Sequence, residues 1–233
     1  MRLLKVLLST ILEVLPARFS EVIVWKLISV EDLLAERASK SSGCSFSTDW
    51  VSRPAPLWTR YLGELRGLEN VHLLEIGSSE GRSAIWFLDN VLTHPTSSIT
   101  CVDVFSARVK ETRFDHNTKL SGFSNKVTKI KGRSQEVLKL LREGSYDVIY
   151  IDGSHRAADV HVDALLSWAL LKPGGIIIFD DYAWKPEKPP EARPQMGIDA
   201  FLNDFRFQVE ILHKGYQVIV RRKHSADGGV AHV

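Results

Sequence analysis

Three carboxylates follow two apolar segments in the second half of the chain. Asp152 comes directly after residues 146–151, and Asp180 and Asp181 come directly after residues 175–179. Three carboxylates at one edge of a sheet suit a hard cation such as Mg²⁺, which completes its shell with water or substrate oxygens. A vicinal diol bound to that cation is easier to ionise. The structural alternative is that Asp152 caps a following helix, while Asp180 and Asp181 line an acceptor pocket that holds no metal.

His155 is the candidate general base, because it lies three residues after Asp152. Imidazole is largely neutral at physiological pH and can accept the proton of a hydroxyl group. The alternative is that the ring only hydrogen-bonds the loop and holds Asp152 in place. Geometry decides between the two roles, since a base must lie within hydrogen-bonding reach of the proton that it removes.

A second chemical signal is the glycine-containing turn in residues 73–83. Gly77 lets the chain turn sharply, and Gly81 removes a side chain where a ligand or a helix approaches. A following helix would offer free N–H groups to an anion. A dinucleotide fingerprint would need its second glycine at Ser79, so a smaller anion fits better. The carboxylate of an amino acid is such an anion, and Glu75 could accept hydrogen bonds from the ammonium group of the same molecule.

Two further positions suit a nucleoside. Asp103 lies near the end of an expected strand, residues 98–104, where a carboxylate can accept both hydroxyls of a ribose. Its structural alternative is a helix cap. Ser134 and Gln135 begin a later helix on the same expected edge, where they either contact an adenine or cap that helix.

A strand–helix–strand unit between Tyr146 and Tyr182 would position the acidic residues. Neither apolar run alternates with polar residues, which is typical of strands that are covered on both faces. Residues 157–171 have helical spacing between the runs, and residues 172–175 predict a helix stop followed by a turn. A right-handed crossover makes the two strands parallel, so Asp152 and the later pair of aspartates should emerge at one carboxyl edge.

The same alternation of strands and helices extends to both sides of this unit. The expected elements are a helix over residues 56–65, a strand over 71–76, a helix over 81–92, a strand over 98–104, a strand over 126–131, helices over 134–142 and 198–205, and strands over 207–212 and 217–222 joined by a turn at 214–215.

The composition indicates one domain with an appendage. The chain has 233 residues, of which 44% are hydrophobic and 25% are charged, enough for a single α/β core. A net charge of +2 without a dense basic cluster argues against nucleic acid as a partner. The two cysteines, Cys44 and Cys101, form neither a disulfide framework nor a metal motif, which favours a reduced, cytoplasmic setting.

Three parts are predicted along the chain. Residues 1–40 form an amphipathic helical arm, residues 45–223 form the main domain, and residues 224–233 form a disordered tail. The apolar run of the arm is too short to span a membrane, and charged residues interrupt what would otherwise be a secretory signal. The arm carries few cations for anionic lipid, so packing or pairing with a second subunit is favoured over contact with a membrane surface. We therefore expect a homo-oligomer.

Residues 71–222 resemble the class I S-adenosylmethionine-dependent methyltransferases. The sequence Leu-Glu-Ile-Gly-x-x-x-Gly is similar to their first motif, Asp103 to their ribose-binding acid, and Leu-Lys-Pro-Gly-Gly to the turn before their fifth strand. The resemblance implies a Rossmann-like, doubly wound α/β fold, with a mostly parallel seven-stranded sheet, helices on both faces and an antiparallel C-terminal hairpin. It implies that S-adenosylmethionine is bound by Glu75, Gly77, Ser78, Ser79, Gly81, Ser83, Asp103, Ser134, Gln135 and Asp152.

Within that class the sequence is most similar to the metal-dependent O-methyltransferases of the catechol and antibiotic-sugar types. The resemblance implies metal ligands at Asp152, Asp180 and Asp181. The catechol enzyme has an asparagine in place of Asp181 and its catalytic lysine where this chain has His155. The sugar enzymes have a catalytic aspartate where this chain has Ser154. The resemblance therefore supports the assignment of the metal ligands better than the assignment of His155 as the base.

The expected function is metal-assisted O-methylation of a hydroxylated small molecule, such as a sugar, a phenol or a natural product. Tyr182, Trp184 and the proline-rich residues 185–194 would form a loop over the site and select the acceptor, unless they are a simple exposed connection. Two alternatives stay open: a metal-independent methyltransferase for another acceptor, and a module that binds S-adenosylmethionine without catalysis.

Overall fold

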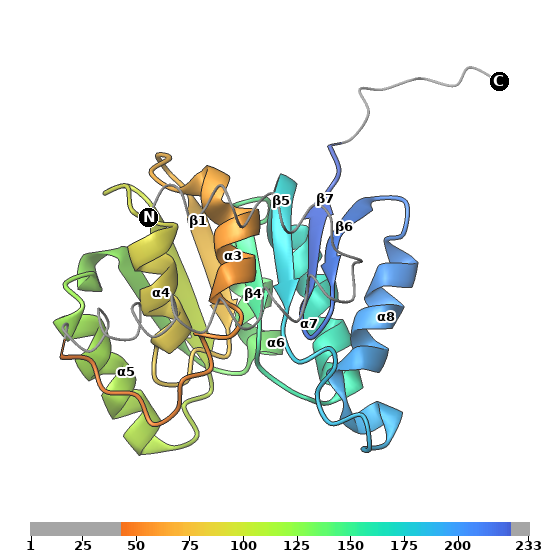
Figure 1. Cartoon of the computed structure of the whole chain (residues 1–233), viewed down its shortest axis with the longest axis horizontal. Coiled ribbons are helices and arrows are strands. Elements are labelled where there is room, and N and C mark those ends of the chain that lie inside the picture. Colours follow the sequence, from red (N-terminus) through yellow and green to blue (C-terminus); the bar gives the residue numbers. More distant parts are fainter. Residues whose placement is uncertain (1–42, 225–233) are drawn as a thin grey trace, which may run out of the picture. The chain divides into compact units, whose positions relative to one another are not determined.

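The computed structural model describes residues 43–224, which form a sheet covered by helices (Figure 1). The predicted arm, residues 1–40, and nearly all of the predicted tail lie outside the described residues. The strands are β1 (His72–Ile76), β2 (Ser98–Asp103), β3 (Val127–Lys131), β4 (Tyr146–Ile151), β5 (Leu171–Phe179), β6 (Val209–Lys214) and β7 (Val218–Arg222). Within this range no helix is long and apolar enough to cross a membrane.

The strands form one sheet in the order β3-β2-β1-β4-β5-β7-β6. Strands β1 to β5 run parallel to one another, and β7 pairs in antiparallel fashion with both β5 and β6. The expected mostly parallel sheet with an antiparallel C-terminal hairpin is therefore confirmed. The strand order reverses between β1 and β4. Open α/β sheets bind their ligands at the carboxyl edge of such a switch point.

Helices cover both faces of the sheet, which explains why its strands do not alternate. Consecutive residues of one strand enter two different cores: Leu73 belongs to the core that contains Trp58 and Phe87, whereas Leu74 belongs to the core that contains Trp168. Helices α3, α4 and α5 lie on the first face and α6, α7 and α8 on the second. Their bounds are α3 (Ala55–Leu62), α4 (Arg82–Asn90), α5 (Arg108–Leu120), α6 (Ser134–Val137), α7 (Ala157–Leu170) and α8 (Pro194–Asp204), with short 3₁₀ turns η1 (Gly63–Leu65), η2 (Ser124–Lys126), η3 (Leu138–Leu140) and η4 (Pro190–Ala192).

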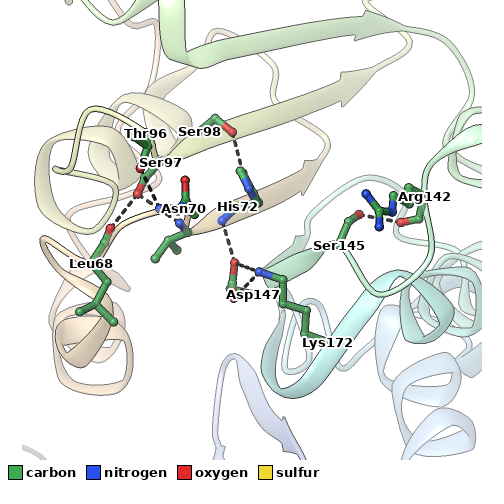
Figure 2. A network of polar contacts seen from close by, with 11 residues as sticks. Leu68, Asn70, His72, Thr96, Ser97, Ser98, Arg142, Ser145, Asp147 and Lys172 are labelled. Carbon is green, nitrogen blue, oxygen red and sulfur yellow. Dashed lines mark hydrogen bonds and ion pairs between the residues drawn. The ribbon is translucent and has the colours of Figure 1, made fainter.

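The amino-terminal edge of the parallel strands is held by a polar network (Figure 2). The Asp147 carboxylate accepts the His72 N–H at 2.8 Å and the Lys172 ammonium at 2.7 and 2.8 Å. The His72 ring lies 3.0 Å from the Ser98 hydroxyl. These contacts join the starts of β1, β2, β4 and β5, and so align the carboxyl ends of the same strands on the opposite edge.

The structure adds one helix to the predicted elements and corrects two predictions. Helix α5 was not predicted, because only Phe114, Asn117 and Thr118 of its thirteen residues are buried and its apolar periodicity is weak. The predicted turn at residues 172–175 is instead an irregular part of β5, in which Tyr146 pairs with Leu171 but Val148 pairs with Ile176. The predicted helix over residues 134–142 is only α6 followed by η3.

Candidate active site

Backbone pairing carries the predicted acids to one edge. The N–H groups of Gly77, Asp152 and Asp180 donate to Val102, Ile76 and Ile151, respectively, at 2.8 to 3.0 Å. The parallel pairing therefore continues one residue beyond β1, β4 and β5. The prediction that Asp152 and Asp180 emerge side by side is confirmed.

A cavity of about 360 Å³ opens at this edge, between the loops that follow β1, β2, β3 and β4. Four of its lining residues were predicted to bind the cofactor: Gly77, Asp103, Ser134 and Gln135. Gly132, Arg133, Gly153, Ser154 and Asp159 line it as well, although the sequence did not assign these residues to the cofactor. The cavity has the position expected for the nucleoside part of a cofactor.

The turn after β1 requires glycine at two positions. Gly77 has φ +95°, and a Cβ atom there would lie 2.1 Å from the carbonyl oxygen of Asp152. Gly81 has φ +82°, and its Cβ would lie 3.1 Å from the ring of Phe114 in α5. The first glycine therefore lets the turn pack on the end of β4, and the second lets a helix approach. Ser79, between them, also has positive φ, at +47°.

Asp103 fixes the turn and faces the cavity. Its carboxylate accepts the Ser79 N–H at 2.8 Å and the Phe105 N–H at 2.6 Å. The following helix begins only at Arg108, after Ala107, so Asp103 does not cap it. A carboxylate has about four acceptor positions, and the two left by these bonds suit ribose hydroxyls.

Glu75 and Ser78 are buried beneath the turn. Glu75 is 0% exposed, and burial raises its pKa to about 7. The hydroxyls of Ser83 and Ser78 lie close enough to lower that pKa in part, but no described residue forms a hydrogen bond of normal geometry with either carboxylate oxygen. The Ser78 hydroxyl also lacks such a partner. Polar groups left without partners beside a predicted ligand site are consistent with a group of the ligand completing their hydrogen bonds.

Asp159 of α7 connects α6 with the loop after β4 at the cavity wall. Its carboxylate accepts the Ser154 hydroxyl at 2.8 Å and the Gln135 side-chain amide at 3.4 Å. Ser134 and Gln135 are the first two residues of α6, and the residue at its N-cap position is Arg133. Behind them lies Asp163, whose pKa burial raises to about 6, with Ser134 opposing the shift and Asp159 adding to it.

Tyr150 lies between two of the predicted metal ligands. Its buried hydroxyl is 3.2 Å from Asp152 Oδ2 and donates a still shorter hydrogen bond to Asp180 Oδ2. Burial and the negative charge of neighbouring carboxylates raise the pKa of both aspartates. The buried Gln217 amide also lies beside Asp180, and its oxygen accepts the Trp58 indole N–H at 2.9 Å.

The third aspartate contacts the candidate base. Asp181 Oδ2 lies 2.6 Å from His155 Nε2, and its Oδ1 accepts the Tyr216 hydroxyl at 2.6 Å. Asp181 has φ +59°, an unusual value for a residue with a side chain. The rings of His155 and Trp184 have their centroids 4.3 Å apart. With the Nε2 proton directed at Asp181, Nδ1 of His155 is the nitrogen that can accept a proton.

Asp152, Asp180 and Asp181 are oxygen ligands of the kind that a divalent cation prefers, but their placement does not form a three-ligand site. Mutual repulsion of Asp152 and Asp180 is the electrostatic condition that a cation relieves. In residues 43–224, however, no group of three His, Cys, Asp or Glu side chains is placed to hold a metal ion. Asp181 instead contacts His155 and Tyr216. The residues as placed do not form the predicted three-ligand site.

The sheet order and the cavity at its switch point define the fold of the class I S-adenosylmethionine-dependent methyltransferases, as the resemblance implied. The comparison with protein families agrees, because residues 74–182 match a family described as "Methyltransferase domain". The match and the sheet order confirm the fold that the resemblance implied.

Part of the chain is also similar to curated proteins. A protein of Mycobacterium sp. (strain JLS) named "Putative O-methyltransferase" is 31% identical over 107 residues, which are 46% of this chain and 46% of that protein. The chain thus spans about half the length of the curated relatives that it matches.

Two solved structures share the fold. TomG, an O-methyltransferase of tomaymycin synthesis from Streptomyces achromogenes, was determined with S-adenosylmethionine; it is 20% identical, with a TM-score of 0.57 over 74% of this chain and 81% of its own. MycE of the mycinamycin pathway was determined with Mg, S-adenosylhomocysteine and mycinamycin VI; it is 19% identical, with a TM-score of 0.57 over 78% of this chain and 53% of its own.

Proposed function

We propose that this protein transfers a methyl group from S-adenosylmethionine to a hydroxyl oxygen of a small molecule. The observation that carries the proposal is the position of the cavity, which contains Gly77 and Asp103 and adjoins the loop of the His155–Asp181 pair. The names of the O-methyltransferase relatives and the cofactors in TomG and MycE support the same reaction.

In this proposal the two ends of the cofactor occupy two parts of the edge. Asp103 accepts the ribose hydroxyls, and Ser134 and Gln135 contact the adenine. The amino-acid end lies at the glycine turn, where Ser78 and Glu75 have buried polar atoms without protein partners. Ser79 and Gly81 shape the same turn, and Ser83 follows it as the second residue of α4. Asp152 directly precedes Gly153, which lines the cavity.

The chain's own part in the chemistry is to orient the acceptor and remove its proton. S-adenosylmethionine supplies an electrophilic methyl group, and its sulfur keeps the electron pair of the broken carbon–sulfur bond. His155 Nδ1 accepts the hydroxyl proton while Asp181 holds the ring through Nε2, and the acceptor oxygen forms the new bond to the methyl carbon. The products are a methyl ether, S-adenosylhomocysteine and a proton. Trp184, against the His155 ring, places the loop after β5 beside the acceptor.

Metal assistance by Asp152, Asp180 and Asp181 is the alternative form of this proposal. In this form Asp181 binds the metal ion instead of His155, so its carboxylate cannot hold the imidazole at the same time. The two forms differ in a simple assay. A metal-assisted enzyme loses turnover after EDTA treatment and regains it with Mg²⁺, whereas the metal-free form keeps its full rate.

Cofactor binding tests the function directly. Calorimetry should show binding of S-adenosylhomocysteine to the full chain, and Asp103→Ala should weaken it by about 1.5–3 kcal/mol, the range for hydrogen bonds to a charged acceptor. Asp115→Ala, which removes an aspartate from the exposed side of α5, is the matched control. Equal affinity in the Asp103 variant and the wild type would exclude the assigned ribose site.

We also propose a hydroxylated acceptor of the sugar, phenol or natural-product class, a cytoplasmic setting and a homo-oligomer paired through residues 1–40. The free thiols of Cys44 and Cys101 support the reduced setting. Light scattering on the full chain tests the oligomer, since a monomeric particle would contradict it.

A further inference from the structure

Residues 44–52, here called the strap, have no helix or strand but are bound by buried polar groups. Asn117 of α5, which is 0% exposed, accepts the Ser45 N–H through Oδ1 at 2.9 Å and donates Nδ2 to the Ser45 carbonyl at 2.9 Å. Both backbone groups of Ser45 are therefore paired by one amide. The same Nδ2 lies 3.0 Å from the carbonyl oxygen of Glu80.

Glu80 holds the strap from the glycine turn itself. Its side chain is largely buried, and its Oε2 accepts the Ser47 N–H at 2.6 Å. Its Oε1 accepts the Ser47 hydroxyl at 2.9 Å and Arg113 Nη1 at 2.6 Å. One carboxylate thus joins three segments: the turn, the strap and α5. Glu80 stands between Ser79 and Gly81, which both have positive φ. Bonds to the Glu80 side chain therefore constrain the backbone that shapes the cofactor turn.

The strap continues from the turn toward the candidate base. Asp49 lies 3.4 Å from Nε of Arg82, the first residue of α4. Just beyond the strap, the Arg53 guanidinium lies 4.7 Å above the ring of Tyr216, whose hydroxyl donates to Asp181. The polypeptide from Ser47 to Arg53 therefore connects the cofactor turn with the residues that hold the candidate base.

We propose that Glu80 is a positioning residue that couples the strap to the amino-acid end of the cofactor site. This inference rests on the proposed function, since it assigns that end of the cofactor to the glycine turn. Coupling between two sites is reciprocal, so a ligand that fixes the turn must also stabilise the strap, and release of the strap must weaken the ligand by the same factor.

Hydrogen–deuterium exchange of the full chain tests the coupling, with S-adenosylhomocysteine as the probe. In the wild type the ligand should slow exchange of the Ser45 and Ser47 amides about tenfold. In Glu80→Gln, where one amide oxygen replaces two acceptors, that slowing should be largely lost. Ser47→Ala removes one bond from an exposed residue without touching the core, so it should lose part of the effect. Glu111→Gln removes a carboxylate of α5 that is paired with Lys131 of β3, and this variant should behave as the wild type.

Calorimetry supplies a second readout. Glu80→Gln should bind S-adenosylhomocysteine about tenfold more weakly but adenosine, which lacks the amino-acid end, with wild-type affinity. If both ligands keep wild-type affinity and the strap exchanges faster with and without ligand alike, Glu80 is only a structural contact and the coupling is overturned. If the wild type binds no S-adenosylhomocysteine, the proposed function fails and the coupling fails with it.

Discussion

Glu75→Gln should make the protein more stable above neutral pH, although it removes a predicted cofactor contact. Glu75 is 0% exposed, and burial raises its pKa from 4.5 to about 7. Glutamine keeps the size and shape of the side chain but carries no charge. The variant therefore isolates the cost of holding an ionised carboxylate beneath the glycine turn.

The sign and size of the effect follow from proton linkage. Below about pH 4.5 the carboxyl is protonated in the folded and the unfolded chain, so the raised pKa has no effect on stability. As pH rises toward 7 the folded chain holds the proton that the unfolded chain has lost, and the free energy of unfolding falls. Above pH 7 nearly all of the loss has occurred. The rise of the Glu75 pKa from 4.5 to about 7 corresponds to about 3 kcal/mol, at ~1.4 kcal/mol for each pH unit.

Urea unfolding followed by tryptophan fluorescence measures this difference, since the chain has six tryptophans. The free energy of unfolding of Glu75→Gln minus that of the wild type should increase by about 3 kcal/mol from pH 4.5 to pH 8. The exposed Glu143→Gln should show no such increase. A difference that stays constant over this range would refute the argument. Weaker binding of S-adenosylhomocysteine by the stabilised variant would show that the acid is kept for the ligand.

Three further predictions concern the same edge. Gly77→Ala should unfold the domain or lower its melting temperature strongly, because its Cβ would lie 2.1 Å from a backbone oxygen, whereas Gly122→Ala, with φ +78° and no atom within 4 Å, should cost only about 1–2 kcal/mol; similar melting temperatures would contradict this. His155→Ala should lower turnover by about 10²–10⁴ with unchanged S-adenosylhomocysteine affinity, and near wild-type turnover would remove it as the base. Asp163→Asn should gain stability relative to the wild type between about pH 4 and 6, because the raised pKa of the acid makes its ionised form costly; chemical denaturation at both pH values checks the sign.

The sequence determined those features that depend on local pattern. The unbroken apolar runs of β4 and β5 predicted strands covered on both faces, and the two cores confirm this. The acids that end those runs reach one edge because parallel strands share their direction. The sequence also predicted the glycines of the turn. The structure adds a second reason for Gly77: besides its positive φ, a Cβ atom there would clash with the backbone of Asp152.

Only the tertiary structure decided the pairings between distant side chains. The sequence assigned Asp181 to a metal site and His155 to the base or to the support of Asp152. In the structure the backbone of Asp181 is left-handed and its carboxylate contacts the His155 imidazole. Helix α5 has too weak an apolar pattern to be predicted, so the contact of Arg113 with Glu80 could not be foreseen. Such contacts depend on how loops end and how helices pack, which a single strand or helix pattern does not encode.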